Sequence, residues 1–206
     1  GDPCLYGAIR EQMDALDADG IAYDDTPGVS SFCGAAAALN AEYTLPTVSQ
    51  TVIITRMEGR TPVPEREKLA SLAAHGATMV IFLSIGLVDK VQDALLQGGA
   101  YTPDTPAAVV ERGTTPAQRR VSASLAELPR AAEAAAVQSP AVIVVGGVCA
   151  LADQFDWFDH LPLKGKRVVV TRPRERAGTL SARLRALGAD VWEYPCIATV
   201  PITPCP

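Results

Sequence analysis

Apolar residues along this chain recur with the two periods that distinguish helices from strands. From Leu5 to Leu16 they return every three or four positions and Gly20 follows, which predicts a helix over residues 5–19. Other segments carry runs of β-branched residues, as "SQTVIITR" does around residues 51–55. Strands are expected at 21–25, 51–55, 77–83, 107–111 and 141–145 with a β-ribbon at 119–124, and further helices at 31–40, from about 64, at 87–97 and at 124–136. This alternation argues for an α/β domain whose sheet is largely covered by helices.

The pattern changes after residue 150 and then starts again. Residues 151–164 combine aromatic, acidic and proline residues and are expected to form a linker or a short docking helix. From residue 165 a strand, a helix that ends at Gly188 and a second strand follow, which predicts one βαβ unit over 165–206. A unit this short can hardly bury a core by itself. We therefore expect an incomplete second α/β domain, and a chain that is incomplete at both ends.

Composition narrows the classes of function. The formal charge of −5 gives no electrostatic support for a nucleic-acid partner. The longest apolar runs, such as "TMVIFLSIGLV", have the length of a buried strand, so no membrane span is expected. The five cysteines form no CxxC pair, and with only two histidines they predict no metal site. We expect a cytoplasmic protein with reduced thiols.

Three glycine turns are candidate ligand sites. They are the Gly-Asp-Pro at residues 1–3, "PGVSS" at residues 27–31 and "ERGTT" at residues 111–115. Glycine permits close approach of the backbone, and the amides of a following helix favour an anionic or polar ligand group. Ligands gather at strand ends in α/β proteins, so three such turns together indicate a binding site. In the alternative interpretation, Asp2, Ser30 and Ser31 only cap helices.

The residues that could carry chemistry are arginines rather than nucleophiles. The sequence contains no G-x-S-x-G elbow, no HExxH and no Walker loop. Arg56, Arg60 and Arg112 could bind an anionic substrate, since guanidinium groups match carboxylates well. The alternative is that they belong to an ordinary charged surface. A sequence with candidate arginines and without a nucleophile motif fits catalysis by positioning of the substrates, without a covalent intermediate, best.

Four motifs together carry a family resemblance. "GDPCLYGAI", "TPGVSSFCGAAAALN", "SQTVIITRMEGRTPVPE" and "SPAVIVVGGV" resemble, in order and spacing, the tetrapyrrole (corrin/porphyrin) methylases, over about residues 1–150. The resemblance implies S-adenosylmethionine as cofactor and two α/β domains that enclose a cleft. Residues 1–45 would be the C-terminal part of the first domain and residues 46–150 the second. The family's N-terminal strand–helix region is absent, so we expect a fragment of this two-domain fold followed by the incomplete βαβ unit.

Different parts of the chain resemble different members of the family. "LPTVSQTVIITRMEGRTPVPE" looks most like the precorrin-4 C-11 methyltransferases, whereas "PAAVVERGTTPAQRRVSASLAEL" looks more like the uroporphyrinogen-III C-methyltransferases. The tail from residue 165 is similar to the start of uroporphyrinogen-III synthase, a domain commonly fused behind the second of these enzymes. A natural hybrid protein and a mis-joined sequence would both explain why different parts of the chain resemble different enzymes.

The resemblance also implies roles for individual residues. Ser84 stands where the uroporphyrinogen enzymes usually carry methionine, which favours the precorrin-4 interpretation for the front half. The expected cofactor-binding residues are Gly1, Asp2, Ser30, Ser31, Ser84, Gly113 and Ala141, and the expected substrate-binding residues are Arg56, Arg60 and Arg112.

The expected reaction is methyl transfer from a sulfonium to a ring carbon of a polycarboxylate tetrapyrrole, first of all C-11 of precorrin-4. Sulfur is already a good leaving group, so orientation is the main task, and it contributes up to roughly 7–11 kcal/mol in ideal cases. One alternative is a uroporphyrinogen-III methyltransferase, giving precorrin-2, fused to uroporphyrinogen-III synthase. Another is an inactive fragment that only binds ligand. Family resemblance further suggests a homodimer.

Overall fold

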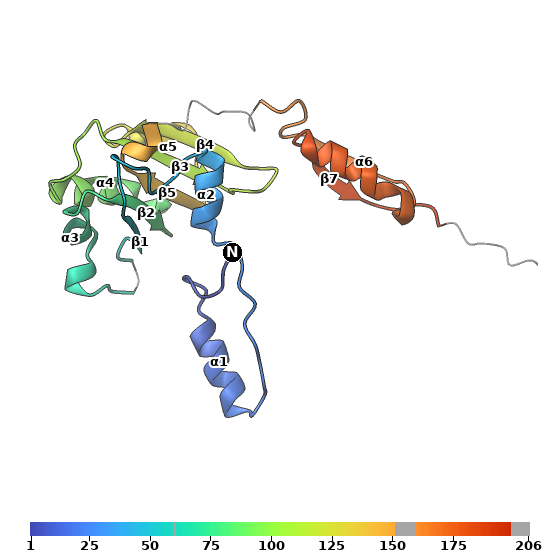
Figure 1. The fold of residues 1–206 in the computed structure, drawn as a ribbon, viewed down its shortest axis with the longest axis horizontal. Helices are drawn as coiled ribbons and strands as arrows, with labels where there is room; N and C mark the ends of the chain where they lie inside the picture. The colour runs from blue at the N-terminus through green and yellow to red at the C-terminus, as the bar shows by residue number, and fades with distance from the viewer. Residues whose placement is uncertain (60, 151–159, 199–206) are drawn as a thin grey trace, which may run out of the picture. The chain divides into compact units, whose positions relative to one another are not determined.

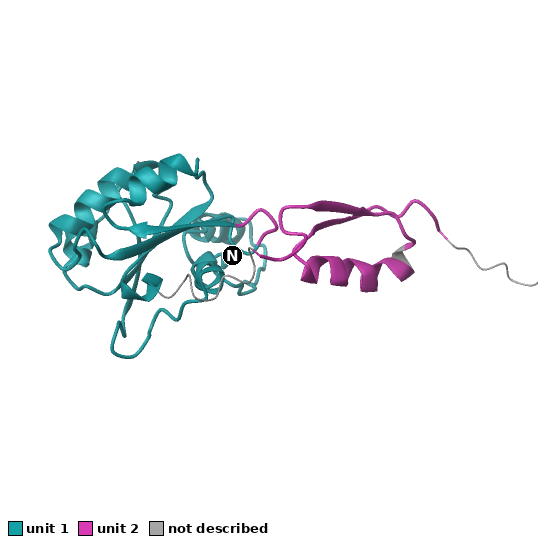
Figure 2. Ribbon diagram, turned by 90° about the horizontal axis from the view of Figure 1, so that it is seen from above, with its two compact units in different colours: residues 1–114, 119–155 teal, residues 115–118, 156–206 magenta. Residues whose placement is uncertain are grey.

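The computed structural model of this protein describes residues 1–59, 61–150 and 160–198. The chain divides into two compact units (Figure 2). Unit 1 comprises residues 1–114 and 119–155, and unit 2 comprises residues 115–118 and 156–206. Most of the predicted linker lies outside the described residues, and the predicted division of residues 1–150 at residue 45 stays a prediction.

Unit 1 is built on a five-stranded mixed sheet with the order β1-β2-β5-β3-β4 (Figure 1). Only β1 and β2 are parallel, and the other neighbouring strands are antiparallel. The strands are β1 (Val52–Arg56), β2 (Thr78–Phe82), β3 (Pro106–Glu111), β4 (Arg119–Ser124) and β5 (Ala141–Val145). The strand expected at 21–25 is not formed, because this exposed segment pairs with no neighbouring strand.

Helices cover the two faces of this sheet unequally. α3 (Leu69–Ala73), α4 (Val88–Gln97) and α5 (Leu128–Ala134) pack on the face that presents Met79, Ile81 and Ile143. α2 (Ser31–Leu39) covers the opposite face, which presents Val80, Val142 and Val144. Successive residues of a strand point to opposite faces, so an uninterrupted apolar run such as β2 fills both cores.

Several helices are shorter than the sequence pattern predicts. The helix expected over residues 5–19 is α1 (Ile9–Ala18), because Tyr6 and Ala8 adopt left-handed backbone conformations that a helix cannot contain. Its predicted end at Gly20 is confirmed, with the Gly20 N–H bonded to the Asp17 carbonyl. α1 buries none of its side chains and extends away from the sheet (Figure 1). α4 (Val88–Gln97) confirms the helix predicted at 87–97 to within one residue. The helices predicted from about 64 and over 124–136 begin later, because a 3₁₀ turn at Glu65–Glu67 precedes α3 and a turn precedes α5.

Unit 2 contains the predicted strand, helix and strand. β6 (Arg167–Val170) and β7 (Asp190–Glu193) are parallel, and α6 (Arg174–Ala186) connects them. The Gly188 N–H bonds to the Arg185 carbonyl and the Ala189 N–H to the Leu184 carbonyl, which is the Schellman arrangement that ends a helix. The predicted βαβ unit is therefore confirmed, while its likeness to uroporphyrinogen-III synthase stays a prediction. Along the described parts of the chain, no helix has the length and apolar character needed to cross a membrane.

Candidate functional site

The sequence-predicted site residues that the structure describes gather near one edge of the sheet of unit 1. β1 and β2 are parallel and end there, while β5 runs antiparallel to β2 and begins there. β3 ends at the same edge, since Glu111 pairs with Ala141 in the ladder between β3 and β5. We call this edge, formed by Arg56, Phe82, Glu111 and Ala141, the site edge. Ser84, Arg112 and Gly113 follow β2 and β3 directly and therefore lie beside it.

The Gly-Asp-Pro loop is tied to the turn before α2 by a single carboxylate. Asp2 accepts a hydrogen bond from the Gly28 N–H on Oδ2 at 3.0 Å and another from the Cys4 N–H on Oδ1 at 2.9 Å. These backbone hydrogen bonds, the one from Gly28 first, lower the pKa of Asp2 below its ordinary value of 3.8. Asp2 therefore holds two of the three predicted ligand turns together, and it is not the cap of α1.

Lowering the pH through the pKa of Asp2 is expected to release this connection. Because the folded-state pKa is depressed, the contribution of the carboxylate is complete above 3.8 and disappears as the pH falls through the lower folded-state value. The amide proton shift of Gly28, followed by NMR in a pH titration, should show this step. In an Asp2→Asn variant the same titration should show no step at Gly28. A step that persists in the variant would assign the titration to another group.

The same two loops pack with no room for a side chain. A Cβ on Gly28 would lie 2.5 Å from the Gly1 carbonyl oxygen and 3.1 Å from its carbon. The Cβ position of Gly1 lies 3.9 Å from the Ser31 nitrogen, so the loop runs past the N-terminus of α2. The Ser30 side chain makes no capping hydrogen bond, although Ser30 is the N-cap residue. Ser30 therefore occupies the N-cap position and caps α2 only through its backbone carbonyl, which accepts from the Cys33 and Gly34 N–H groups.

α2 brings this assembly against the end of β3. A Cβ on Gly34 would lie 2.9 Å from Cγ2 of Thr114, and the Cβ position of Gly113 lies 3.9 Å from the Gly34 backbone. A side chain at residue 34 would require the Thr114 side chain to move, so glycine at this position permits the close approach of helix and turn. The structure thus brings the loop containing Gly1, the N-terminus of α2 and the turn containing Gly113 together.

Backbone strain gathers at the ends of β2 and β3. Leu83, Arg112 and Thr114 have φ angles of 54°, 48° and 65°, which residues with a side chain rarely adopt. Such conformations persist where the surroundings determine them, and they cluster at functional sites. Leu83 is also 70% exposed although it is apolar. The sequence does not single out Leu83, since a leucine that follows a buried strand is expected to belong to the hydrophobic core.

Tyr6 connects the Gly-Asp-Pro loop to the same strand end. Its ring lies 5.4 Å from the ring of Phe82, measured between centroids. Burial raises the pKa of the Tyr6 hydroxyl, which therefore stays protonated. The Cys4 thiol donates a hydrogen bond to Asp25, and this bond raises the thiol's pKa to about 11. At neutral pH Cys4 is a thiol rather than a nucleophilic thiolate.

Ser84 and Arg56 are both engaged by the protein itself. The Ser84 hydroxyl donates to the Phe82 carbonyl at 2.6 Å and accepts from the Met57 N–H at 2.8 Å, and it is almost fully buried. It joins the segments that follow β1 and β2. The Arg56 guanidinium donates to the Thr61 carbonyl at 3.2 Å and 3.3 Å. Their contacts to cofactor and substrate stay predictions, and Arg60 lies outside the described residues.

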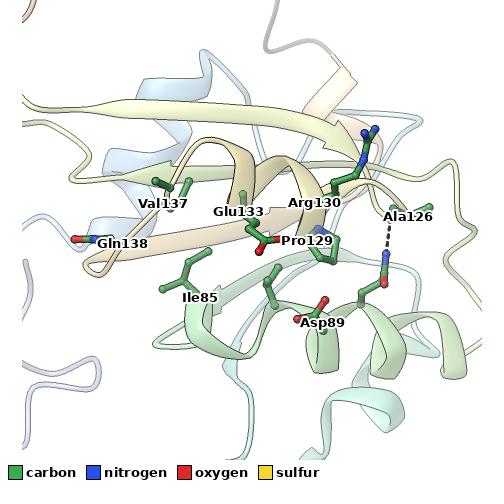
Figure 3. Close-up of a pocket in the computed structure, with 12 residues that line it drawn as sticks. Ile85, Asp89, Ala126, Pro129, Arg130, Glu133, Val137 and Gln138 are labelled. Carbon is green, nitrogen blue, oxygen red and sulfur yellow. Dashed lines mark hydrogen bonds between the residues drawn. The ribbon is translucent and has the colours of Figure 1, made fainter.

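A groove of about 660 Å³ lies between α4 and α5 (Figure 3). One end contains Ile85 and Val137 and adjoins the site edge, since Ile85 follows Ser84 and Val137 shortly precedes Ala141. Arg130 lies toward the other end (Figure 3), and its guanidinium pairs with Glu127. Both ends of the groove combine apolar and polar side chains, with Gln138 beside Val137 near the site edge and Pro129 beside Arg130 farther away (Figure 3).

Fold and site edge together define an α/β protein with a candidate small-molecule site built from glycine turns and strained strand ends. The family model Tetrapyrrole (Corrin/Porphyrin) Methylases matches residues 1–129, and the chain belongs to this family. The predicted resemblance and the predicted α/β fold class are thereby confirmed.

Among curated relatives, a cobalt-precorrin-4 C(11)-methyltransferase from Methanocaldococcus jannaschii is 48% identical over 148 residues, covering 72% of this chain and 57% of the relative. A precorrin-4 C(11)-methyltransferase from Mycobacterium tuberculosis is 46% identical, with 72% and 59% covered. A porphyrin biosynthesis protein HemD from Ruminiclostridium josui is 37% identical over 98% of this chain and 40% of its own length. The chain thus spans little more than half the length of the precorrin-4 relatives.

The similar solved structures are tetrapyrrole methyltransferases as well. A cobalt precorrin-4 methyltransferase superimposes with a TM-score of 0.70 at 44% identity, covering 72% of this chain and 62% of that one. A uroporphyrin-III C-methyltransferase from Thermus thermophilus, complexed with S-adenosylhomocysteine, gives a TM-score of 0.60 at 26% identity, with 73% and 64% covered.

Proposed function

We propose that this chain serves the S-adenosylmethionine-dependent C-methylation of a tetrapyrrole, with C-11 of precorrin-4 as the favoured acceptor. The observation that carries the proposal is the site edge, where the Gly-Asp-Pro loop, the N-terminus of α2 and the strained ends of β2 and β3 meet. It occurs in a chain 48% identical to a cobalt-precorrin-4 C(11)-methyltransferase.

The residues at the site edge fit this cofactor. The first-turn N–H groups of α2, beside Ser30 and Ser31, suit the cofactor's carboxylate. The glycines at 1 and 113 let backbone groups approach a ligand closely. Ile85 and Val137 offer apolar surface to a flat purine ring. When bound, the cofactor supplies a methyl group on a sulfonium.

The chain's own contribution is to hold the cofactor and the substrate and to orient them for methyl transfer. The site needs no charged nucleophile, which agrees with the protonated state of Cys4. Arg56 and Arg112 lie at or beside the site edge and are the proposed partners of substrate carboxylates, together with Arg60. A homodimer in the cytoplasm completes the proposal, and sedimentation of the purified chain would test the dimer.

Calorimetric titration with S-adenosylhomocysteine tests the cofactor site. We expect the chain to bind it, and an Ile85→Glu variant to bind at least about tenfold more weakly, because a carboxylate replaces apolar surface beside the purine. Arg130→Ala, at the far end of the same groove, is the matched control and should keep the wild-type affinity. Absence of binding to the wild-type chain would contradict the proposed function.

The second candidate is uroporphyrinogen-III methylation in a protein that continues into a synthase domain. The HemD relative favours it, because it matches 98% of this chain, including the βαβ unit. Labelled S-adenosylmethionine with precorrin-4 or uroporphyrinogen III, offered separately, distinguishes the two. Transfer only to precorrin-4 supports the first candidate and transfer to uroporphyrinogen III the second. Cofactor binding with transfer to neither supports a protein that only binds ligand.

A further inference from the structure

We propose that Glu111 and Arg119 form a clamp that positions the two backbone segments facing the cofactor at the site edge, residues 112–113 and 138–141. This inference rests on the proposed function, because it assigns the clamp's purpose to cofactor binding. Neither residue is expected to touch the cofactor. Both act through the backbone that they hold, so they are positioning residues.

Glu111 is a nearly buried carboxylate with partners on both of its oxygens. Its side chain is 5% exposed and forms an ion pair with Arg119. Oε2 accepts a hydrogen bond from Arg119 Nε at 2.7 Å, and Oε1 accepts one from the Gln138 N–H at 3.4 Å. A buried carboxylate is tolerated only when it is paired and hydrogen-bonded in this way. The last residue of β3 is thus connected to the segment that leads into β5.

Arg119 extends the connection to the end of α5. Its Nη1 donates to the Ala135 carbonyl at 2.9 Å and its Nη2 to the Ala136 carbonyl at 3.2 Å. The planar guanidinium spreads five N–H donors over three nitrogens and so reaches a carboxylate and two carbonyls that lie apart, whereas an ammonium group has its three donors on one nitrogen. Ala136 has a φ of 48°, so the chain turns sharply there before it enters residues 138–141.

The clamped segments are the ones that the candidate site uses. Arg112 follows Glu111 with a φ of 48°, and its N–H donates to the Pro140 carbonyl at 3.0 Å. Gly113 and Ala141, both predicted cofactor contacts, flank this hydrogen bond. A strained backbone keeps its conformation only when its surroundings determine it. The ion pair of Glu111 and Arg119, which lies beside Arg112 and Gln138, holds the backbone in this conformation.

The test compares variants of this chain that carry single substitutions in the pair. Glu111→Gln keeps the shape of the side chain but removes its charge. Arg119→Lys keeps the positive charge but loses the planar guanidinium group with its several N–H donors. Glu127→Gln is the matched control, because it also removes a carboxylate from an arginine pair, but at the exposed turn before α5. The readouts are the affinity for S-adenosylhomocysteine by calorimetry and residue-resolved amide hydrogen exchange.

We expect Glu111→Gln to weaken binding about tenfold or more, since hydrogen bonds to charged groups are among the strong ones. Exchange should accelerate at residues 112–113 and 138–142, while the centres of β2 and β5 keep their protection. Arg119→Lys should bind more tightly than Arg119→Ala, and Glu127→Gln should match the wild type.

Three results would overturn the inference. Unchanged affinity in Glu111→Gln, with a wild-type chain that binds, rejects the clamp and leaves the proposed function standing. Faster exchange spread evenly over the whole sheet shows a role in stability alone. A wild-type chain that does not bind S-adenosylhomocysteine rejects the proposed function, and the clamp's purpose with it.

Discussion

Substitution of Gly28 by valine is expected to abolish the binding of S-adenosylhomocysteine while the sheet stays folded. The first carbon of the new side chain would lie 2.5 Å from the Gly1 carbonyl oxygen, well inside van der Waals contact. The loop cannot simply move aside, because Asp2 holds the Gly28 N–H. The sheet should survive, since α1, which connects the two loops, buries no side chain. Calorimetry and circular dichroism measure the two effects separately.

Gly178→Ala is the control for this substitution. Gly178 lies inside α6, and nothing stands within 4 Å of the position of its Cβ. Alanine there should leave binding unchanged and favour the helix by about 1 kcal/mol. If Gly28→Val bound the ligand as tightly as the wild type, the close packing of the two loops would not be a requirement of the site.

Substitution of Ile143 by alanine is expected to lower the free energy of unfolding of unit 1 by about 2–5 kcal/mol. Ile143 has no exposed surface and lies in β5, between its ladder partners Ile81 in β2 and Val109 in β3. Removing its outer carbons leaves a cavity that two neighbouring strands cannot close. Urea denaturation followed by circular dichroism measures the loss as a lower midpoint.

Val48→Ala provides the comparison, because Val48 is 46% exposed. It should change the free energy of unfolding by no more than about 0.5 kcal/mol. A loss below about 1 kcal/mol for Ile143→Ala would show that the site collapses around the smaller side chain, contrary to the packing inferred for β5.

The strands of unit 1 could be predicted because their signal is local. β2, β3 and β5 are short apolar runs bounded by turns, and their burial on both faces requires that composition. Segment 21–25 also contains apolar residues, together with two acidic ones, but it pairs with no strand, and its local pattern does not reveal that a neighbour is missing. The start of α1 was predicted too early because the left-handed conformations at Tyr6 and Ala8 depend on packing around the loop.

The candidate site could be predicted only in part. Gly1, Asp2 and Gly113 belong to motifs that the sequence displays directly. Nothing in the sequence around Tyr6 and Leu83 indicates that they lie at the site, because the exposure of an apolar residue depends on what packs around it. Glu111 was noticed only as part of a turn motif, and its partners lie 8 and 27 positions away in the chain.

The sequence by itself determined most of the strands, the family and the identity of the glycine turns, since each depends on residues close together in the chain. Only the tertiary structure decided that these turns meet at one edge, because strand order and strand direction depend on long-range pairing. It likewise decided that Ser84 joins two loops and that Glu111 binds Arg119. A polar side chain acts through the partner it meets, and folding chooses that partner.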